Sequence, residues 1–298
     1  MNRDEYCCRE LILISEENPR LNREYIGKMY SAGPILVDVD SIRHYALATN
    51  ERNSLYTEEQ HAKELIAPPI YPVVFIPPLL EQLVEDGETM GLDVLRVVHA
   101  EQEMTWNSVI RPGDEIYSSA RIVEMKKLGA NEILELEILC KRQDKLVVEM
   151  QYRLLLRGEK KSEPKKAKPV EDQERGRKIA EQKVFVTEDQ GIRYAEASGD
   201  HNPIHTSDEV ARLAGLPKSI LQGLCTMAIA SQAIVDELLN GDPSRLKVMK
   251  VRFSKPVFMG QELTTEIYES EPEGHVVHFE TKDSKGVPVL TRGIAEYV

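Results

Sequence analysis

An acid and an imidazole stand five positions apart in the second half of the chain, within the stretch YAEASGDHNPIH over Tyr194–His205. The pair is Asp200 and His205, and a rigid Asn-Pro corner lies between them. Turn-forming residues surround the pair, so a plain helix-ending loop accounts for the glycine and the proline. Such a loop does not require a carboxylate and an imidazole, which can converge on one water molecule. The spacing therefore predicts general acid–base catalysis on a bound water.

The elements that hold this loop are indicated by the hydrophobic pattern on either side of it. A short strand and a helix are expected over Val184–Ala197, and a longer helix over Gly223–Leu239. The longer helix is apolar almost all round until Asp236 and Glu237, and a helix without a polar face must be enclosed. The loop therefore lies in a helix–loop–helix setting whose second helix is buried.

Four segments of alternating hydrophobicity follow the long helix. In the first of them Met249, Val251 and Phe253 face one way, while the residues between them face the other. The four segments, separated by turn signals, are Val248–Ser254, Glu262–Tyr268, His275–Thr281 and Val287–Val298. One buried helix followed by an antiparallel meander predicts a sheet curled around that helix, which is the hotdog arrangement.

The first half of the chain repeats this pattern. Tyr45–Thr57 matches Tyr194–Thr206 without gaps at an offset of 194 − 45 = 149, and a later turn containing Gly113 or Gly260 matches at 260 − 113 = 147. Four more strands are expected at Val97–Ile110, Glu115–Lys127, Glu132–Cys140 and Leu146–Leu156. We therefore expect an α+β fold, a tandem (double) hotdog in which each unit is an antiparallel sheet wrapped around a long central helix.

A charged segment separates the two units. Gly158–Lys178 contains two apolar side chains, Ala167 and Val170, among prolines and many charges, so burial cannot offset the entropy lost on ordering it. The expected organisation is an N-terminal hotdog over residues 1–157, a linker over 158–178, and a C-terminal hotdog over 179–298 that contains the acid–imidazole pair.

The motif carries a family resemblance. Tyr194 followed by Gly-Asp-x-Asn-Pro-x-His resembles the signature of the MaoC-like dehydratases, the R-specific enoyl-CoA hydratases. The stretch LQGLCTM over Leu221–Met227 resembles the start of their central helix, with Gln222 where a histidine is common. The resemblance covers nearly the whole chain, with the signature intact only in the second half. It implies reversible hydration of trans-2-enoyl-CoA to (R)-3-hydroxyacyl-CoA, or the reverse dehydration.

The resemblance also implies a role for individual residues. Asp200 and His205 would hold the water and share the two proton transfers, with either one as acid or base. The backbone N–H of Gly223, at the start of the buried helix, would stabilise negative charge on the thioester oxygen. Three residues would support the loop: Tyr194, Asn202 and Pro203. Three basic residues are candidates for contact with the phosphates of CoA, although a solvated-charge role fits each as well: Lys218, Arg252 and Lys255.

The first half is expected to be a catalytically silent partner that shapes the substrate tunnel. In the repeat Asp200 corresponds to Glu51, and His205 corresponds to Tyr56. A tyrosine, with a reference pKa of about 10, cannot serve as a near-neutral base, and the longer glutamate would misplace its carboxylate. The segment Ala67–Pro78 is so rich in proline that its helix must start late. The late start either opens room for an acyl chain or simply makes a rigid turn.

Composition excludes several classes of partner. The 298 residues carry 38 basic and 50 acidic side chains, a net charge of −12, which argues against nucleic acid or an anionic membrane surface. No segment has the length of a membrane helix, and the N-terminus lacks the layout of a signal peptide. The cysteines match neither a metal site nor a disulfide framework, so we expect reduced thiols in a cytoplasmic protein: Cys7, Cys8, Cys140 and Cys225.

No cofactor and no metal are expected, apart from coenzyme A as part of the substrate. The sequence contains no cluster with metal-ligand spacing and no glycine-rich dinucleotide fingerprint. The expected partner is an acyl-CoA or acyl carrier protein thioester, and the chain is either a monomer or a homodimer. A hotdog thioesterase is the rival enzyme. A non-catalytic acyl-thioester-binding or scaffolding subunit is the alternative from another class, although it would need neither Asp200 nor His205.

Overall fold

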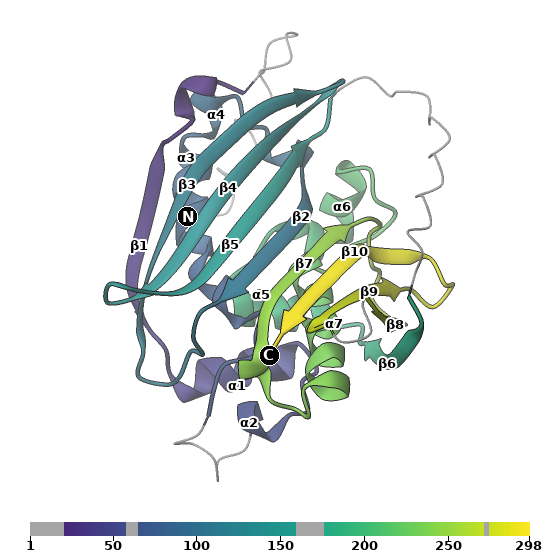
Figure 1. Ribbon diagram of the computed structural model, residues 1–298. Helices are drawn as coiled ribbons and strands as arrows, with labels where there is room; N and C mark the ends of the chain where they lie inside the picture. Colours follow the sequence, from purple (N-terminus) through teal and green to yellow (C-terminus); the bar gives the residue numbers. More distant parts are fainter. Residues whose placement is uncertain (1–20, 58–64, 159–175, 271–273) are drawn as a thin grey trace, which may run out of the picture.

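A single antiparallel sheet of ten strands dominates the computed structural model of the protein, which describes residues 21–57, 65–158, 176–270 and 274–298 (Figure 1). The strand order is β1-β3-β4-β5-β2-β7-β10-β9-β8-β6. In the first half the strands are β1 (Met29–Leu36), β2 (Val97–Trp106), β3 (Glu115–Leu128), β4 (Asn131–Arg142) and β5 (Lys145–Leu156). In the second half they are β6 (Lys178–Val186), β7 (Leu246–Phe253), β8 (Gln261–Glu269), β9 (Val276–Lys282) and β10 (Pro288–Tyr297).

The two halves of the sheet have the same strand order when each is read outward from the centre of the sheet. Read outward, the first half runs β2, β5, β4, β3, β1 and the second runs β7, β10, β9, β8, β6, so each strand has its counterpart five strands later. The central pair, β2 and β7, is antiparallel, with Gln102 opposite Val251 and Met104 opposite Met249. This order confirms the duplicated unit, and it joins two hotdog sheets edge to edge.

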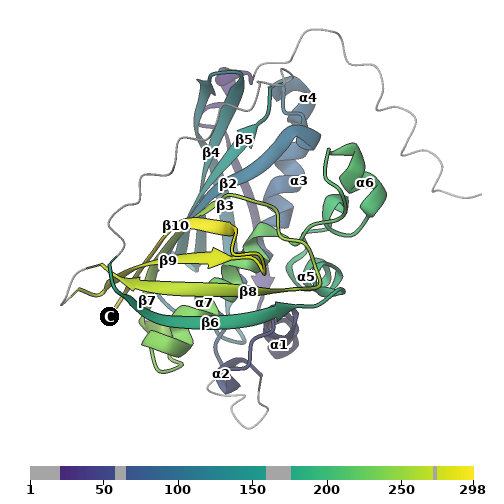
Figure 2. The ribbon, with the colours of Figure 1, turned by 90° about the vertical axis from the view of Figure 1, so that its right-hand side faces the viewer.

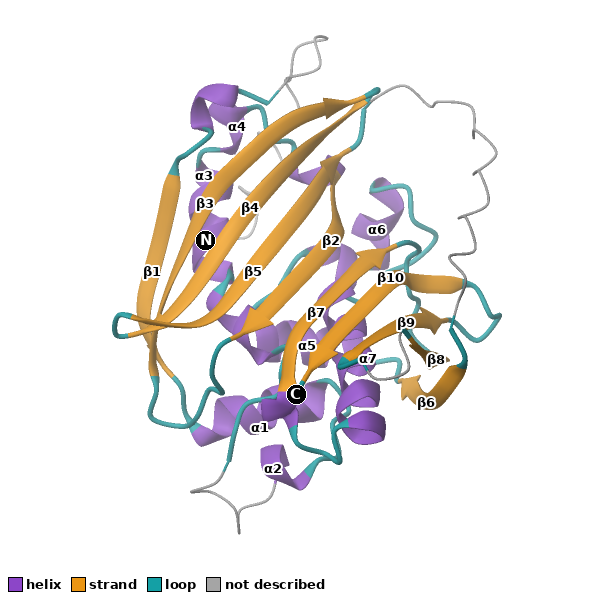
Figure 3. Ribbon diagram, in the orientation of Figure 1, coloured by secondary structure: helices purple, strands orange, loops and turns teal. Residues whose placement is uncertain are grey.

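The helices lie on one side of the sheet (Figure 3). The α-helices are α1 (Val39–Ala48), α2 (Ser54–Thr57), α3 (Pro77–Glu85), α4 (Gly87–Met90), α5 (Gln190–Ser198), α6 (Asp208–Leu213) and α7 (Gly223–Leu238). Short 3-10 turns are η2 (Arg23–Tyr25), η4 (Tyr71–Phe75), η5 (Val94–Arg96), η6 (Pro203–His205) and η7 (Pro243–Arg245). Within the described residues, no helix combines the length and the apolar character needed to span a membrane.

The buried central helix of the second half is α7, as its apolar sequence predicts. It has 16 residues, and all those from Cys225 to Val235 are buried, whereas Asp236 and Glu237 are exposed. Figure 2 shows the strands of the second half curving around it. Alternate residues of β7 are buried, as expected of a strand with one face on the core. Fully burying an aliphatic side chain of this kind stabilises the fold by about 1.5–3 kcal/mol.

The first half follows the same plan with a shorter helix. Its central helix, α3, has nine residues and begins at Pro77, after the 3-10 turn η4. The late start predicted from the prolines is therefore confirmed. Tyr71 and Phe75 of η4 are buried, so large side chains fill the segment before α3.

The strands of the two meanders agree with those expected from the sequence to within a few residues, and the largest difference is that β2 ends at Trp106 rather than at Ile110. The boundary of the charged segment differs slightly, because β6 begins at Lys178 and pairs there with Tyr268 of β8. Residues 159–175, which make up most of that segment, lie outside the described residues.

Candidate active site

The loop that carries the acid–imidazole pair begins where α5 ends. Gly199 terminates the helix in a left-handed conformation, with φ 77°, which glycine adopts without strain. A Cβ built on Gly199 would lie 2.9 Å from Cγ of Pro77 in the first half. Glycine is therefore required here twice over, for the turn and for the close approach of the two halves.

Asp200 follows directly and is held by local hydrogen bonds. Its backbone N–H donates to Ser198 Oγ at 3.2 Å, and Ser198 Oγ donates to the Tyr194 carbonyl at 2.7 Å. One carboxylate oxygen accepts from the Asn202 N–H at 3.3 Å. The Asp200 side chain remains 39% exposed, so the carboxylate is accessible to a ligand.

His205 is placed by the Asn-Pro corner and oriented by its ring nitrogen. Asn202 caps the turn η6 by accepting from the Ile204 N–H at 3.3 Å, and Pro203 occupies its first position. His205 Nδ1 lies 2.8 Å from the Ile220 carbonyl oxygen. Because a carbonyl only accepts, Nδ1 carries the hydrogen and Nε2 is the acceptor in the neutral ring.

The Asp200 carboxylate and the His205 imidazole lie close together, as the sequence predicts. His205 Nε2 and Asp200 Oδ2 are 3.8 Å apart, beyond a direct hydrogen bond but within reach of one bridging water. His205 is 8% exposed, whereas Asp200 is open on one side. The pair therefore presents two proton acceptors to the same small space.

Gly223 is the first residue of α7, which confirms the predicted start of the central helix. A Cβ on Gly223 would lie 3.1 Å from two ring carbons of Phe253, so that ring packs on the glycine backbone. Gln222, where the resembling family commonly has histidine, is fully buried, and its Nε2 donates to the Gly191 carbonyl at 3.0 Å. The substituted residue thus ties the start of α7 to α5.

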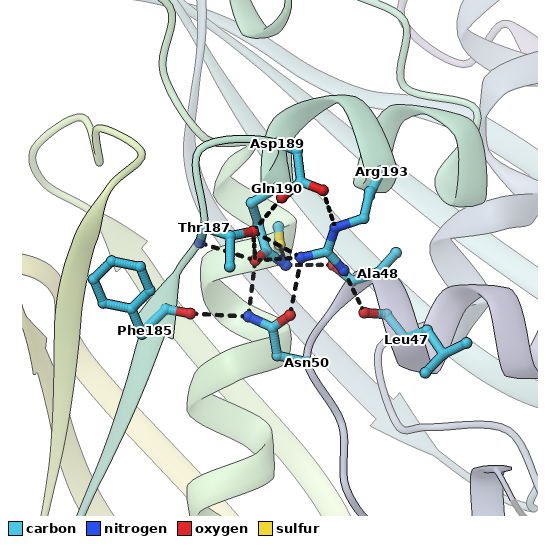
Figure 4. Close-up of polar contacts among 9 residues, drawn as sticks. Leu47, Ala48, Asn50, Phe185, Thr187, Asp189, Gln190 and Arg193 are labelled. Atoms are coloured by element: carbon cyan, nitrogen blue, oxygen red, sulfur yellow. Dashed lines mark hydrogen bonds and ion pairs between the residues drawn. The ribbon is translucent and has the colours of Figure 1, made fainter.

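A polar network fastens α5 to the first half of the chain (Figure 4). Arg193 donates to the Leu47 carbonyl at 2.7 Å and to Asn50 Oδ1 at 3.1 Å. Asn50 in turn donates to the Phe185 carbonyl at 3.0 Å and to Gln190 Oε1 at 2.8 Å. Gln190 also donates to the Ala48 carbonyl. These bonds cross between the halves, so they set the position of the helix that leads into Asp200.

A tyrosine pair forms a second contact between the halves. Tyr194 is fully buried, and its hydroxyl lies 3.3 Å from the Tyr45 hydroxyl, with the ring centroids 5.7 Å apart. The two tyrosines are the matching first residues of the repeated stretch. Tyr194 therefore contacts its own counterpart in the repeat, and its role in supporting the loop stays a prediction.

The basic residues proposed for phosphate contact lie in three different settings. Lys218 is partly buried, with Nζ 5.9 Å from the centre of the Phe258 ring. Lys255 is exposed in the loop after β7. Arg252 is also exposed and alternates with buried Val251, so it lies on the outer face of the sheet. Their role in binding phosphate stays a prediction.

Cys225 lies near the site without the character of a nucleophile. It is fully buried in α7, and burial raises the pKa of its thiol to about 12. The thiolate is the reactive form of cysteine, so this residue is an inert part of the core. Within the described part of the chain, no group of three or more His, Cys, Asp or Glu side chains gathers as metal ligands would.

Sequence reasoning missed the network around Arg193. Asn50 and Gln190 are ordinary polar residues at helix ends, and their partners lie about 140 positions away in the chain. One signal was available, because Asn50 aligns with Gly199 in the repeat. Both adopt a positive φ, 61° for Asn50 and 77° for Gly199, and asparagine is a common substitute for glycine in that conformation.

Comparison with known families matches each half of the chain separately. Residues 170–289 match the family described as "MaoC like domain", and residues 24–150 match "FAS1-like, dehydratase domain region". The Dictyostelium discoideum protein named "Probable enoyl-CoA hydratase 2" is 28% identical over 234 residues, which cover 76% of this chain and 79% of that protein. The Mycobacterium tuberculosis "3-hydroxyacyl-thioester dehydratase Y" is 44% identical over 115 residues, or 37% of this chain and 39% of that protein.

The fold comparison points the same way. A crystal structure of a MaoC-like dehydratase from Phytophthora capsici superimposes with a TM-score of 0.79 at 21% sequence identity. The superposition covers 93% of this chain and 98% of the other. Both halves therefore share the arrangement of that fold.

Proposed function

Because the chain belongs to the MaoC-like dehydratase family, we propose that it catalyses the reversible hydration of trans-2-enoyl thioesters to (R)-3-hydroxyacyl thioesters. Relatives named as a hydratase and a dehydratase support this class of reaction. The observation that carries the proposal is the 3.8 Å gap between Asp200 and His205, which one water can bridge. A carboxylate and an imidazole held in this way can exchange protons with the water that adds to the double bond.

The proposed proton transfers use both acceptors. Water donates one hydrogen to Asp200 Oδ2 and the other to His205 Nε2, which is free because Nδ1 is engaged by Ile220. The water oxygen then bonds to carbon 3 as one of its protons passes to the pair. The pair delivers a proton to carbon 2, so both residues return to their starting protonation states. Dehydration follows the same steps in reverse.

The start of α7 would stabilise the charge that develops during addition. Negative charge builds on the thioester oxygen, and the first N–H groups of a helix have no acceptor within it. The Gly223 N–H is one of these, and the positive end of the helix dipole adds to its effect. Loss of one such donor raises the barrier by about 3–4 kcal/mol.

The substrate carrier, in this proposal, is coenzyme A or an acyl carrier protein. Lys218 and Lys255 are the candidates for its phosphates, and Arg252 remains a third on the outer face. The steps above need no metal and no redox cofactor. A second copy of the chain is a candidate partner as a homodimer. Buried, free Cys140 and Cys225 support a reducing compartment, for which we propose the cytoplasm.

An assay on the purified chain tests the reaction. Loss of enoyl absorbance is followed with trans-2-enoyl-CoAs of increasing chain length, and the product is resolved on a chiral column. We expect the (R)-3-hydroxyacyl-CoA, with turnover that survives exhaustive chelation. Asp200→Asn and His205→Gln serve as inactive controls because they preserve side-chain shape.

The same assay separates the alternatives. A thioesterase would release free thiol, which a thiol reagent detects in the same samples. A scaffolding subunit would bind acyl-CoA in calorimetry without turning it over. Either result would contradict the proposed function, as would an (S) product.

A further inference from the structure

One buried group close to the site has no role in the steps proposed above, and it belongs to the first half. Tyr152 lies on β5 and is 4% exposed. Its hydroxyl is buried and has no hydrogen-bond partner among the described residues. A buried hydroxyl without a partner destabilises a fold, and phenylalanine would fill the same space without that penalty. A tyrosine here leaves a buried donor that is available to a ligand or a water.

Tyr152 belongs to an aromatic stack that leads to the start of α7. Its ring stacks on His99, with centroids 4.6 Å apart and planes at 19°. The His99 ring lies 4.8 Å from that of Phe253, centroid to centroid. Phe253 is the ring that packs on the backbone of Gly223. The stack thus joins β5 and β2 of the first half to the helix start that would bind the thioester oxygen.

The stack is uncharged near neutral pH. His99 Nε2 is also buried without a partner among the described residues, and burial lowers the pKa of His99 to about 4. Burial raises the pKa of Tyr152, and its neighbours Cys140 and Asp200 raise it further. Tyr152 therefore keeps its proton and acts as a donor in the field of the Asp200 carboxylate. A water or a hydroxyl suits that setting, because it can accept from Tyr152 and donate to Asp200.

A second tyrosine feels the Asp200 charge but is already engaged. The pKa of Tyr194 is raised by burial and, to a smaller extent, by Asp200. Its hydroxyl is paired with that of Tyr45 at 3.3 Å. Of these two phenols near Asp200, only Tyr152 has a hydroxyl without a partner among the described residues.

We propose that Tyr152 completes the active site by donating a hydrogen bond to the oxygen that adds to carbon 3. The inference rests on the proposed function. Asp200 and His205 then take the two hydrogens of the water, Tyr152 occupies one lone pair, and the remaining lone pair attacks carbon 3. In the reverse reaction Tyr152 donates to the departing 3-hydroxyl. His99 and Phe253 are positioning residues that hold the Tyr152 ring.

The kinetic test is Tyr152→Phe in the full chain, which removes only the hydroxyl. We expect kcat to fall about tenfold to a hundredfold, the range for loss of a hydrogen bond in a charged site. KM should change less than about twofold, because the enoyl substrate has no oxygen on carbon 3. The melting temperature should stay the same or rise. Tyr117→Phe is the matched control, since Tyr117 is 45% exposed on β3, and it should alter neither constant.

A binding test reports on the same contact without turnover. In the His205→Gln background, calorimetry compares (R)-3-hydroxybutyryl-CoA with butyryl-CoA, which lacks the 3-hydroxyl. Adding Tyr152→Phe should weaken binding of the hydroxylated ligand about fivefold or more and leave butyryl-CoA unchanged.

Two results together would overturn the inference: a wild-type kcat in Tyr152→Phe, and binding of the two ligands that is weakened equally or not at all. The Tyr152 hydroxyl would then be assigned to a structural water. Asp200→Asn would still abolish turnover in that case, so the proposed function would stand. Absence of hydratase activity in the wild-type chain would instead overturn the proposed function, and this inference with it.

Discussion

Two corresponding corners of the molecule, Asp200–His205 and Glu51–Tyr56, have opposite character. The Asp200 side chain is 39% exposed and shares its space with His205 Nε2, whereas Glu51 is 6% exposed and Tyr56 is fully buried. Burial, with the nearby charge of Asp236, raises the pKa of Glu51 to about 8. The Tyr56 hydroxyl is buried with no partner among the described residues. The corner of the first half has kept its packing while losing access to a substrate.

The two halves also differ at the start of the central helix, α7 in the second half and α3 in the first. Phe253 in the second half corresponds to Trp106 in the first, at an offset of 253 − 106 = 147. Phe253 packs on Gly223, where α7 begins, but Trp106 Nε1 donates to the carbonyl of Pro69 at 2.8 Å. The first half has no equivalent helix start, because α3 begins with Pro77 and Pro78, and prolines have no N–H to donate to an oxyanion. A cavity lined in part by Trp106, Pro68, Pro69 and Pro72 lies beside the contact of Trp106 with Pro69.

A duplicated fold can therefore separate packing from chemistry. Asn50 adopts the same left-handed conformation as Gly199, and its side chain reaches across to Gln190 and Phe185. The position that Gly199 occupies in the loop of the second half is thus filled in the first half by a residue whose side chain hydrogen-bonds to the other half. The first half thus supports the site through contacts with α5.

The largest effect should come from exchanging the acid–base groups themselves. Asp200→Asn and His205→Gln should each lower kcat by about 10²–10⁴-fold, because they keep shape and remove proton transfer. Glu51→Gln and Tyr56→Phe, the matched changes in the first half, should leave kcat within about twofold. Steady-state kinetics and circular dichroism on all four variants make the comparison. A folded Glu51→Gln variant without turnover would give the first half a chemical role.

The start of α7 should be nearly as sensitive. Gly223→Ala places a Cβ against the Phe253 ring, so the helix start or the ring must move. Displacing the backbone donor should lower kcat by about 10²–10³-fold. Gly286→Ala is the control, because its turn has φ 75° and open space around an added Cβ. Gly286→Ala should lower the stability without lowering kcat. A lower kcat in Gly286→Ala with an unchanged kcat in Gly223→Ala would contradict the role of the Gly223 N–H as a donor.

The network between the halves should have a moderate effect on both stability and turnover. Asn50→Ala removes the bonds that Asn50 donates to Gln190 and to the Phe185 carbonyl, and the bond that it accepts from Arg193. Urea unfolding should show a loss of about 1–3 kcal/mol, and kcat should fall several-fold as α5 shifts. Arg212→Lys on the exposed surface of α6 should change stability by less than about 1 kcal/mol. Equal effects from the two variants would contradict the role of the network.

Glu51→Gln should change the pH dependence of stability with the smallest effect on turnover. The folded chain holds the Glu51 proton up to about pH 8, while the unfolded chain releases it near the ordinary value of 4.5. The unfolded state therefore binds fewer protons between these values, so stability falls as pH rises from about 4.5 through about 8. The slope is at most about 1.4 kcal/mol per pH unit. Urea unfolding at several pH values should show a flatter profile for Glu51→Gln and greater stability than wild type at pH 9.

Much of the fold and the core of the site could be predicted from local sequence alone. Alternating side chains indicated the meander of each half, and the apolar stretch after Gly223 indicated α7. The turn chemistry of Asn202 and Pro203 placed His205 next to Asp200, because a capped turn acts over a few residues. The prolines before α3 delayed that helix for an equally local reason, since proline removes the N–H that an earlier helical turn would need.

How these local elements contact one another depends on the tertiary structure. The Ile220 carbonyl selects the acceptor nitrogen of His205, and the pairing of β2 with β7 brings His99 against Phe253. Burial of Glu51, and the bonds of Asn50 to α5, likewise depend on surfaces contributed by the other half. A sequence pattern reveals the period of an element and its apolar face. Which faces meet depends on contacts between residues that are often more than a hundred positions apart, and those contacts set burial, hydrogen bonding and proton affinity.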